Sequence, residues 1–169
     1  MGILNTLGLK IKPKAPWSKY YKNGELKIDI PDKSVYDVLK ENSEDHLDAY
    51  AINYLGNNIT YRELLRQIEI CSRAFRSQGI RKGDVVTLCM PNTPEAMIAF
   101  YALNKIGAIA NMIHPLSSEQ EIKNYLISTN SVMLVMIDIC YEKTAGVIKE
   151  TDVYKTVIVS AGSRLKLWK

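Results

Sequence analysis

The sequence predicts an α/β fold with a largely parallel sheet and helices on both faces. Two observations lead to this prediction. Residues 85–90 and 132–137 are continuous apolar runs, which are typical of strands buried on both faces, and helix start and stop signals lie between them. With 47% hydrophobic and 24% charged residues over 169 positions, the composition is that of an ordinary globular protein of one domain.

The first 33 residues differ from the rest in composition. They contain three prolines and seven lysines against three acidic residues, with little periodicity, and we expect an extended basic leader arm over 1–33. Residues 34–169 hold 15 basic and 15 acidic residues. A nucleic-acid binder normally carries a basic stripe on its folded face, so no nucleic-acid partner is expected.

Helix and hairpin signals begin directly after the arm. Ser34 is an N-cap that opens a first helix, and residues 50–59 alternate around a glycine turn, which predicts a short hairpin. Thr60 and Glu63 have capping-box spacing at the start of a second helix, which Gly79 ends. The parallel sheet is therefore expected to follow an arm, a helix and a hairpin.

Strands and helices alternate after Gly79. Each predicted strand is followed by a helix-length crossover, as parallel pairing requires. After the strand at 85–90, the remaining elements are a helix that follows Thr93 and ends at Gly107, a strand at 108–113, a helix starting at Ser117 or Ser118, a strand at 132–137, a helix near 141–150 and a strand at 156–159.

Cysteine usage and hydropathy indicate the compartment. Cys71, Cys89 and Cys140 are odd in number and too far apart for metal-binding C-x-x-C spacing, so neither a disulfide framework nor a metal site is expected. The most apolar stretch, residues 96–103, is far shorter than the roughly 18 residues that span a bilayer. We expect a cytoplasmic protein without membrane association.

Four segments occur in an order that indicates a family. They are residues 59–64 (ITYREL), 79–86 (GIRKGDVV), 90–95 (MPNTPE) and 103–108 (LNKIGA), the last leading to His114-Pro115. Together they resemble the early core motifs of the AMP-forming adenylating superfamily, which includes acyl-CoA synthetases, adenylation domains of peptide synthetases and firefly-type luciferases. Residues 17–29 are similar to the leader of bacterial long-chain acyl-CoA ligases, the members that the chain resembles most.

The motif residues themselves have structural explanations. Thr60 and Glu63 cap a helix, Gly83 and Asp84 turn the chain into a strand, and Gly107 ends a helix. We therefore expect structural rather than chemical roles for all five. No residue of the chain is predicted to be catalytic.

The resemblance implies a function for a longer parent protein. An AMP-forming ligase uses ATP and Mg²⁺ to convert a carboxylate, here a fatty acid, to an acyl-adenylate, and then transfers the acyl group to CoA. The family's phosphate-binding loop, which ends in Pro-Lys-Gly, would lie beyond Ser160. We therefore expect 34–169 to be an incomplete N-terminal α/β subdomain that is inactive alone, binds no cofactor tightly and has the remainder of its own ligase chain as partner.

Two other readings of the sequence remain open. An adenylation domain that loads a carrier protein shares these early motifs with the CoA ligases. A truncated, noncatalytic α/β interaction module is the second alternative.

Candidate site residues follow the strand at 108–113. Ligands of open α/β sheets bind at the carboxyl ends of the strands. His114 lies there, and Ser117 and Ser118 open a helix whose amides could receive a phosphate. In some relatives the corresponding loop faces the CoA nucleotide, so the resemblance implies a nucleotide-facing or active-site loop at His114, Ser117 and Ser118.

Overall fold

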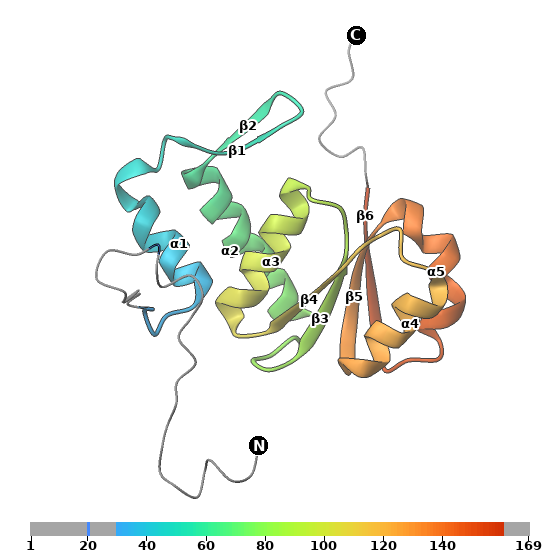
Figure 1. Cartoon of the computed structure of the whole chain (residues 1–169). Helices are drawn as coiled ribbons and strands as arrows, with labels where there is room; N and C mark the ends of the chain where they lie inside the picture. Colours follow the sequence, from blue (N-terminus) through green and yellow to red (C-terminus); the bar gives the residue numbers. More distant parts are fainter. Residues whose placement is uncertain (1–19, 21–29, 161–169) are drawn as a thin grey trace, which may run out of the picture. The chain divides into compact units, whose positions relative to one another are not determined.

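The computed structural model describes residue 20 and residues 30–160 (Figure 1). Contacts divide the chain into units 1–32 and 33–169. Most of the predicted arm lies outside the described residues, so the arm and its boundary stay predictions. Within the second unit, helices and strands run from Val35 to Val159.

Helices and strands alternate along the second unit as the sequence predicts. The helices are α1 (Val35–Ser43), α2 (Tyr61–Ser77), α3 (Pro94–Ile106), α4 (Glu119–Ser128) and α5 (Tyr141–Ile148), with 3-10 turns η3 (Glu44–His46) and η4 (Asp138–Cys140). The strands are β1 (Tyr50–Tyr54), β2 (Asn57–Thr60), β3 (Val85–Cys89), β4 (Ile109–Ile113), β5 (Ser131–Ile137) and β6 (Lys155–Val159). In the part of the chain that the structure describes, no helix has the length and apolarity to cross a bilayer.

Strands β3 to β6 form one parallel sheet in the order β4-β3-β5-β6. Val86 of β3 pairs with Ala110 of β4 and with Met133 of β5, and Met136 of β5 pairs with Ile158 of β6. The predicted parallel α/β architecture is confirmed. Strands β1 and β2 form a separate antiparallel hairpin, also as predicted.

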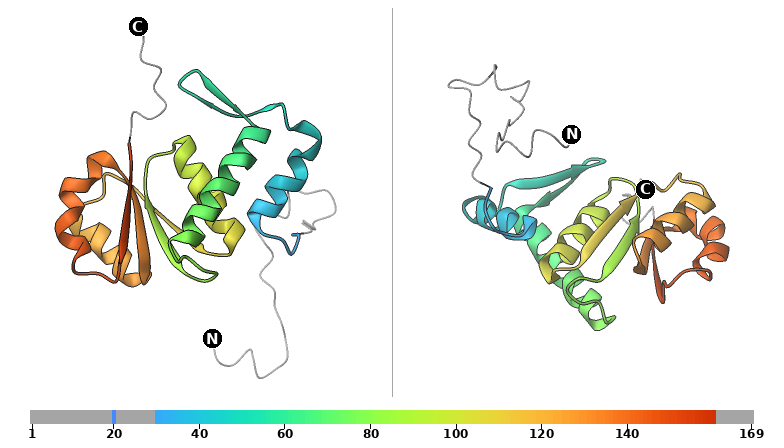
Figure 2. Two further views of the ribbon diagram at one scale, coloured as in Figure 1. Left: turned by 180° about the vertical axis from the view of Figure 1, so that it is seen from behind. Right: turned by 60° about the horizontal axis from the view of Figure 1, so that its bottom comes forward.

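Helices cover both faces of the parallel sheet (Figures 1 and 2). Val86 and Met133 belong to a core cluster with residues of α2 and α3. Cys89 and Leu134 belong to a second cluster with residues of α4. Because successive side chains of a strand point to opposite faces, both faces of these strands need apolar side chains. This explains the unbroken apolar runs in the sequence.

The predicted capping and turn signals have the expected structural roles. The Thr60 hydroxyl accepts the Glu63 amide of α2 at 3.3 Å, which satisfies one of the free N–H groups of the helix start. The Asp84 carboxylate accepts the Arg81 amide at 2.7 Å in the turn before β3. Gly83 has a φ of +90° in the same turn, a conformation that glycine adopts at low cost.

Gly107 ends α3 in a tight space. Its φ is +76°, the left-handed conformation of a helix C-cap. A Cβ at this position would lie 2.9 Å from Cγ of Lys82. Both backbone conformation and space therefore favour glycine here.

A polar cluster joins α1, α2 and α3. Lys105 of α3 forms an ion pair with Glu69 of α2, and its ammonium donates to the Tyr36 hydroxyl of α1 at 3.0 Å. The Tyr36 amide donates to the Asn104 side chain at 2.8 Å. Hydrogen bonds from Lys105 and Arg73 lower the pKa of Glu69 to about 2. The cluster connects helices that flank one face of the sheet.

Candidate functional site

The carboxyl edge of the sheet brings His114 close to the end of the neighbouring strand. His114 follows β4, and it lines a cavity of about 290 Å³ with residues 90–92, which follow β3, and with Met112 and Ile113. The imidazole is exposed, and its Nδ1 accepts the Leu116 amide at 3.1 Å. In the neutral ring, Nε2 then carries the proton and can donate.

His114 is not arranged as one half of a catalytic pair. Within residues 30–160, its only side-chain hydrogen bond is the one to the Leu116 amide. A general base that activates a nucleophile needs a partner within hydrogen-bond reach. The geometry therefore supports a role for His114 as an exposed hydrogen-bond donor at the end of β4.

Ser118 starts α4 in a complete capping box. Its hydroxyl accepts the Glu121 amide at 3.3 Å, and the Glu121 carboxylate accepts the Ser118 amide at 2.8 Å. These bonds from the Ser118 backbone and hydroxyl lower the pKa of Glu121. A negative charge already lies at this helix start, beside Glu119 in the first turn. The Ser118 amide is therefore not free for a phosphate, and the charges of Glu119 and Glu121 disfavour a phosphate at this helix start.

Ser117 contributes to the loop through its backbone. Its amide donates to the His114 carbonyl at 3.1 Å, and its carbonyl accepts the Lys143 ammonium at 2.8 Å. The structure thus places His114, Ser117 and Ser118 in one loop at the carboxyl edge. Their assignment to a nucleotide-facing loop stays a prediction.

Lys143 holds this loop, and the sequence analysis missed it. Its ammonium, half-buried on α5, donates to the Pro115 carbonyl at 2.6 Å as well as to Ser117. The thiol of Cys140 donates to the same Pro115 carbonyl at 3.2 Å. Hydrogen bonds from a charged donor to part-buried carbonyls are strong, so Lys143 is a positioning residue for the loop. No local pattern marks it, because donor and acceptors lie more than 25 residues apart.

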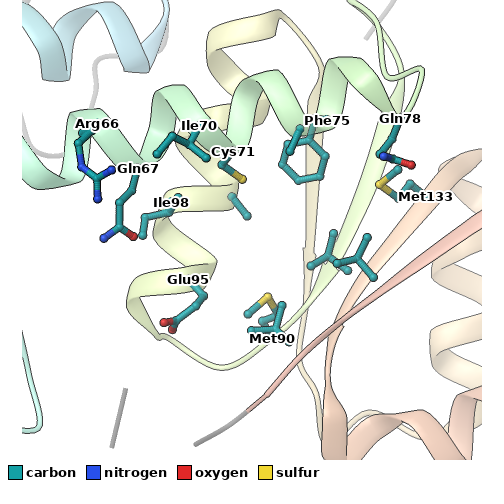
Figure 3. Close-up of a pocket in the computed structure, with 15 residues that line it drawn as sticks. Arg66, Gln67, Ile70, Cys71, Phe75, Gln78, Met90, Glu95, Ile98 and Met133 are labelled. Carbon is teal, nitrogen blue, oxygen red and sulfur yellow. The ribbon is translucent and has the colours of Figure 1, made fainter. Parts of the chain in front are cut away.

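An apolar groove lies between α2, α3 and the sheet (Figure 3). Its volume is about 460 Å³. The groove residues are Ile70, Cys71, Ala74 and Phe75 of α2, Ile98 and Ala99 of α3, and Met90, Met133, Val135, Val157 and Val159 on the sheet side, with Arg66, Gln67, Gln78 and Glu95 as the polar members. The sequence analysis did not predict this groove.

Cys71 and Cys89 are poor nucleophiles in these surroundings. Burial raises the pKa of Cys71, which lines the groove, to about 11. Burial and the neighbouring Cys140 thiol raise the pKa of Cys89 to about 12. A thiol reacts as its thiolate, so none of this favours cysteine catalysis. Among the described residues, no group of three or more His, Cys, Asp or Glu side chains could hold a metal ion.

Comparisons with known proteins agree with the family that the four segments indicate. The family model for "AMP-binding enzyme" matches residues 39–168. The long-chain-fatty-acid–CoA ligase of Bacillus subtilis (strain 168) is 24% identical over 134 residues, covering 79% of this chain and 24% of the relative. The acetyl-coenzyme A synthetase of Shewanella sp. (strain ANA-3) is 37% identical over 100 residues, covering 56% of this chain and 15% of the relative.

A solved structure gives the same result for the fold. The fused adenylation–PCP di-domain NpsA-ThdA, from Klebsiella oxytoca, superposes with a TM-score of 0.66 at 27% identity, covering 76% of this chain and 23% of that chain. The present chain thus spans about a quarter or less of the length of these relatives. Because the family model matches well over half of its residues, the chain belongs to the AMP-binding enzyme family.

Proposed function

We propose that this chain is the N-terminal α/β subdomain of an ATP-dependent, AMP-forming acid–thiol ligase. The observation that carries the proposal is the family match over residues 39–168, which includes the whole parallel sheet. The part of the Bacillus ligase that matches this chain is 24% of that relative, so the relative is about four times as long as the matched part. The described residues contribute the scaffold of such an enzyme.

The proposed reaction has two steps. A carboxylate attacks the α-phosphorus of ATP, giving an acyl-adenylate and pyrophosphate, and the CoA thiol then attacks the acyl carbon and releases AMP. Mg²⁺ would neutralise phosphate charge during the first step. We assign neither step to a residue of this chain, because its carboxyl edge offers no phosphate cradle among the described residues.

The proposed acid is a fatty acid, and CoA is the proposed acceptor. The similarity to the Bacillus long-chain-fatty-acid–CoA ligase extends over 79% of the chain, which supports this choice. The identity to an acetyl-coenzyme A synthetase is higher but extends over only 56% of the chain. This similarity supports a short acid as the alternative substrate. The likeness to a Klebsiella adenylation–PCP protein supports the alternative in which a carrier protein is the acceptor.

The loop at His114, Ser117 and Ser118 is proposed to face the nucleotide part of CoA with the exposed His114 ring, while the Ser118 amide stays bonded to Glu121. Its place at the carboxyl edge supports this role, since ligands of open α/β sheets bind there. Adding CoA should then shift the His114 ring signals in an NMR titration, and unchanged signals would remove the loop from the proposal.

The proposed location is the cytoplasm, which three free cysteines support.

Trapping of the activated acid tests the proposed function. The product of the complete reading frame that contains codons 1–169 is incubated with ATP, Mg²⁺, hydroxylamine and one acid at a time. Acetate, octanoate, palmitate and anthranilate form the panel. Acyl hydroxamate should form, most rapidly with palmitate or octanoate. A fastest reaction with acetate would correct the substrate, and no hydroxamate with any acid would support the noncatalytic module.

A further inference from the structure

Two of the three cysteines meet on the α4 side of the sheet. Cys89 ends β3, and its register partner on the adjacent parallel strand β5 is Met136. The turn η4, which directly follows β5, carries Cys140. Cys89, Met136 and Cys140 belong to the same core cluster, in which Cys89 is 0% and Cys140 1% exposed. The fold thus joins two buried cysteines that are far apart in the sequence.

The side chains of these two cysteines are in direct contact. A hydrogen bond joins the Cys89 and Cys140 thiols. The Cys140 thiol also donates to the Pro115 carbonyl at 3.2 Å. Cys71 lies apart from both, in the groove wall of the cluster that α2 and α3 form. A disulfide needs two cysteines whose side chains already approach each other, and only Cys89 and Cys140 have this arrangement among the described cysteines.

A covalent bond between the two sulfur atoms suits the pair better than a metal ion does. Metal sites in proteins need several Cys, His or carboxylate ligands around one point. In the part of the chain that the structure describes, no three such side chains gather in one place. A thiol pair also differs from a lone buried cysteine, because oxidation of one sulfur places it beside a second thiol that can react with it.

We propose that Cys89 and Cys140 form an intramolecular disulfide when hydrogen peroxide oxidises the pair. The oxidant has to be small, because both sulfur atoms are enclosed. Burial and the Cys140 thiol raise the pKa of Cys89 to about 12, so thiolate is scarce and the reaction is slow. The charge of Lys143 acts on this pKa in the opposite direction and favours the thiolate. The inference does not depend on the proposed function.

The oxidation uses one molecule of hydrogen peroxide for each pair. The thiolate of one cysteine attacks a peroxide oxygen, the O–O bond breaks, and hydroxide leaves, which gives a sulfenic acid. The second thiol attacks this sulfur, so that the S–S bond forms, the S–O bond breaks and water leaves. Two thiols and one hydrogen peroxide therefore give one disulfide and two molecules of water. The two electrons that the sulfur atoms lose reduce the peroxide, and an added dithiol reverses the change.

Formation of the disulfide also changes the loop after β4. Cys140 then has no S–H group and cannot donate to the Pro115 carbonyl, for which Lys143 remains as a donor. The Leu116 and Ser117 amides follow directly and both bond to His114. Because a thiol is a weak donor, we expect these amides to exchange with solvent only roughly threefold faster in the oxidised chain.

Peptide mapping of the folded 169-residue chain tests the pair. Wild type, Cys71→Ser, Cys89→Ala and Cys140→Ala are treated with hydrogen peroxide at pH 8, blocked with iodoacetamide and digested with trypsin in the absence of reductant. The three cysteines fall in different tryptic peptides, residues 67–73, 83–105 and 124–143. Amide hydrogen exchange of the loop is measured on the same samples, before and after oxidation.

Wild type and the matched control Cys71→Ser should both give a linked peptide of residues 83–105 and 124–143. This peptide should lack two hydrogen atoms relative to its two parts and should separate on reduction. Cys89→Ala and Cys140→Ala should give no such peptide. Reduced Cys140→Ala should show the same faster exchange at Ser117 as oxidised wild type, because both lack the thiol donor to Pro115.

Three results would overturn the proposal. The first is sulfinic acid at Cys89 or Cys140 without a linked peptide, which would mean that the backbone keeps the two sulfur atoms from bonding. The second is a link that includes Cys71 or joins two chains. The third is unchanged exchange of the loop after oxidation, which would separate the pair from the loop.

A chain unfolded in urea is the control for the oxidant, since its thiols are accessible. Cross-links there and none in folded wild type would count against the proposal, even if the alanine variants failed to fold. The mapping involves no acid or nucleotide, so failure of the proposed function is seen separately, as absence of acyl hydroxamate.

Discussion

The loop after β4 and the groove beside β6 lie at different parts of the same sheet. The polar groups of the loop are hydrogen-bonded within the chain, whereas the groove exposes apolar side chains. In the loop, the Ser118 amide binds Glu121, and the carbonyls of Pro115 and Ser117 bind Lys143. In the groove, Val157 and its apolar neighbours line a cavity of about 460 Å³. Polar groups that are paired internally hold a local structure together, whereas exposed apolar surface on a sheet favours contact with something else.

The loop and the groove also differ in whether the sequence predicts them. The helix caps arise from residues three positions apart, so they can be read directly. The groove gathers residues from α2, α3, β5 and β6, which are distant in sequence and become neighbours only in the fold. A family motif can therefore mark a well-packed scaffold, while the surface that needs a partner carries no motif.

The largest expected effect concerns α3, which forms one wall of the groove. Leu103→Asp should unfold the domain, because Leu103 is fully buried and an unpaired buried charge costs several kcal/mol. His114→Ala, in the exposed loop, should leave it folded. Circular dichroism melts of both variants make the comparison. Equal losses of stability would mean that the loop is as deeply integrated as the core helix.

A smaller effect is expected when the hydrogen bonds from Lys143 to the loop are removed. Lys143→Met removes two charged hydrogen bonds to carbonyls and should cost about 1 to 2 kcal/mol. Hydrogen exchange at Ser117 should become faster while exchange in β6 stays the same. Lys149→Met, at an exposed lysine after the same helix, is the control. Faster exchange in both regions would show that loop and groove are coupled.

The ion pair between α2 and α3 predicts a dependence on pH. The pKa of Glu69 falls from 4.5 to about 2 on folding, so its contribution to stability is complete above pH 4.5 and is lost as the pH falls towards 2. Lys105→Met should therefore destabilise the domain at pH 6 and matter progressively less at pH 4 and pH 3. Urea unfolding at each pH measures this. A variant that is equally destabilised at all three values would show that Lys105 acts by packing alone.

The smallest effect distinguishes the thiols of the two regions. The pKa of Cys71 is raised from 9.0 to about 11, so its thiolate at pH 7 is roughly 100-fold scarcer than that of an ordinary thiol. Alkylation by iodoacetamide should be slow at Cys71 in the groove wall and slower at the fully buried Cys89. Mass spectrometry of timed samples gives the order. Faster modification of Cys89 would mean that the α4 side opens more readily than the groove.

Much of the fold can be predicted from the sequence. Caps at Ser34, Thr60 and Ser118, the glycine stop at Gly107 and the apolar runs of β3 and β5 all have local signatures, and the structure confirms the elements that they define. The order of the strands in the sheet has no such signature. Pairing of β3 with both β4 and β5 depends on long-range packing, as does the reach of Lys143 to the loop.

The candidate site is less predictable for a related reason. Ser118 has the sequence of a helix start that could bind an anion, but Glu121 in the same capping box takes its amide. The same pattern therefore describes a phosphate site and a self-sufficient cap. His114 shows the opposite case, because only the fold places it beside the loop that follows β3.

We propose that this chain is a scaffold whose chemistry needs the rest of a ligase. Exchange of labelled pyrophosphate into ATP, with the purified 169-residue chain, Mg²⁺ and the same panel of acids, tests it most directly. We expect no exchange above a blank without protein, and exchange by the product of the complete reading frame. Exchange by the 169-residue chain itself would contradict it.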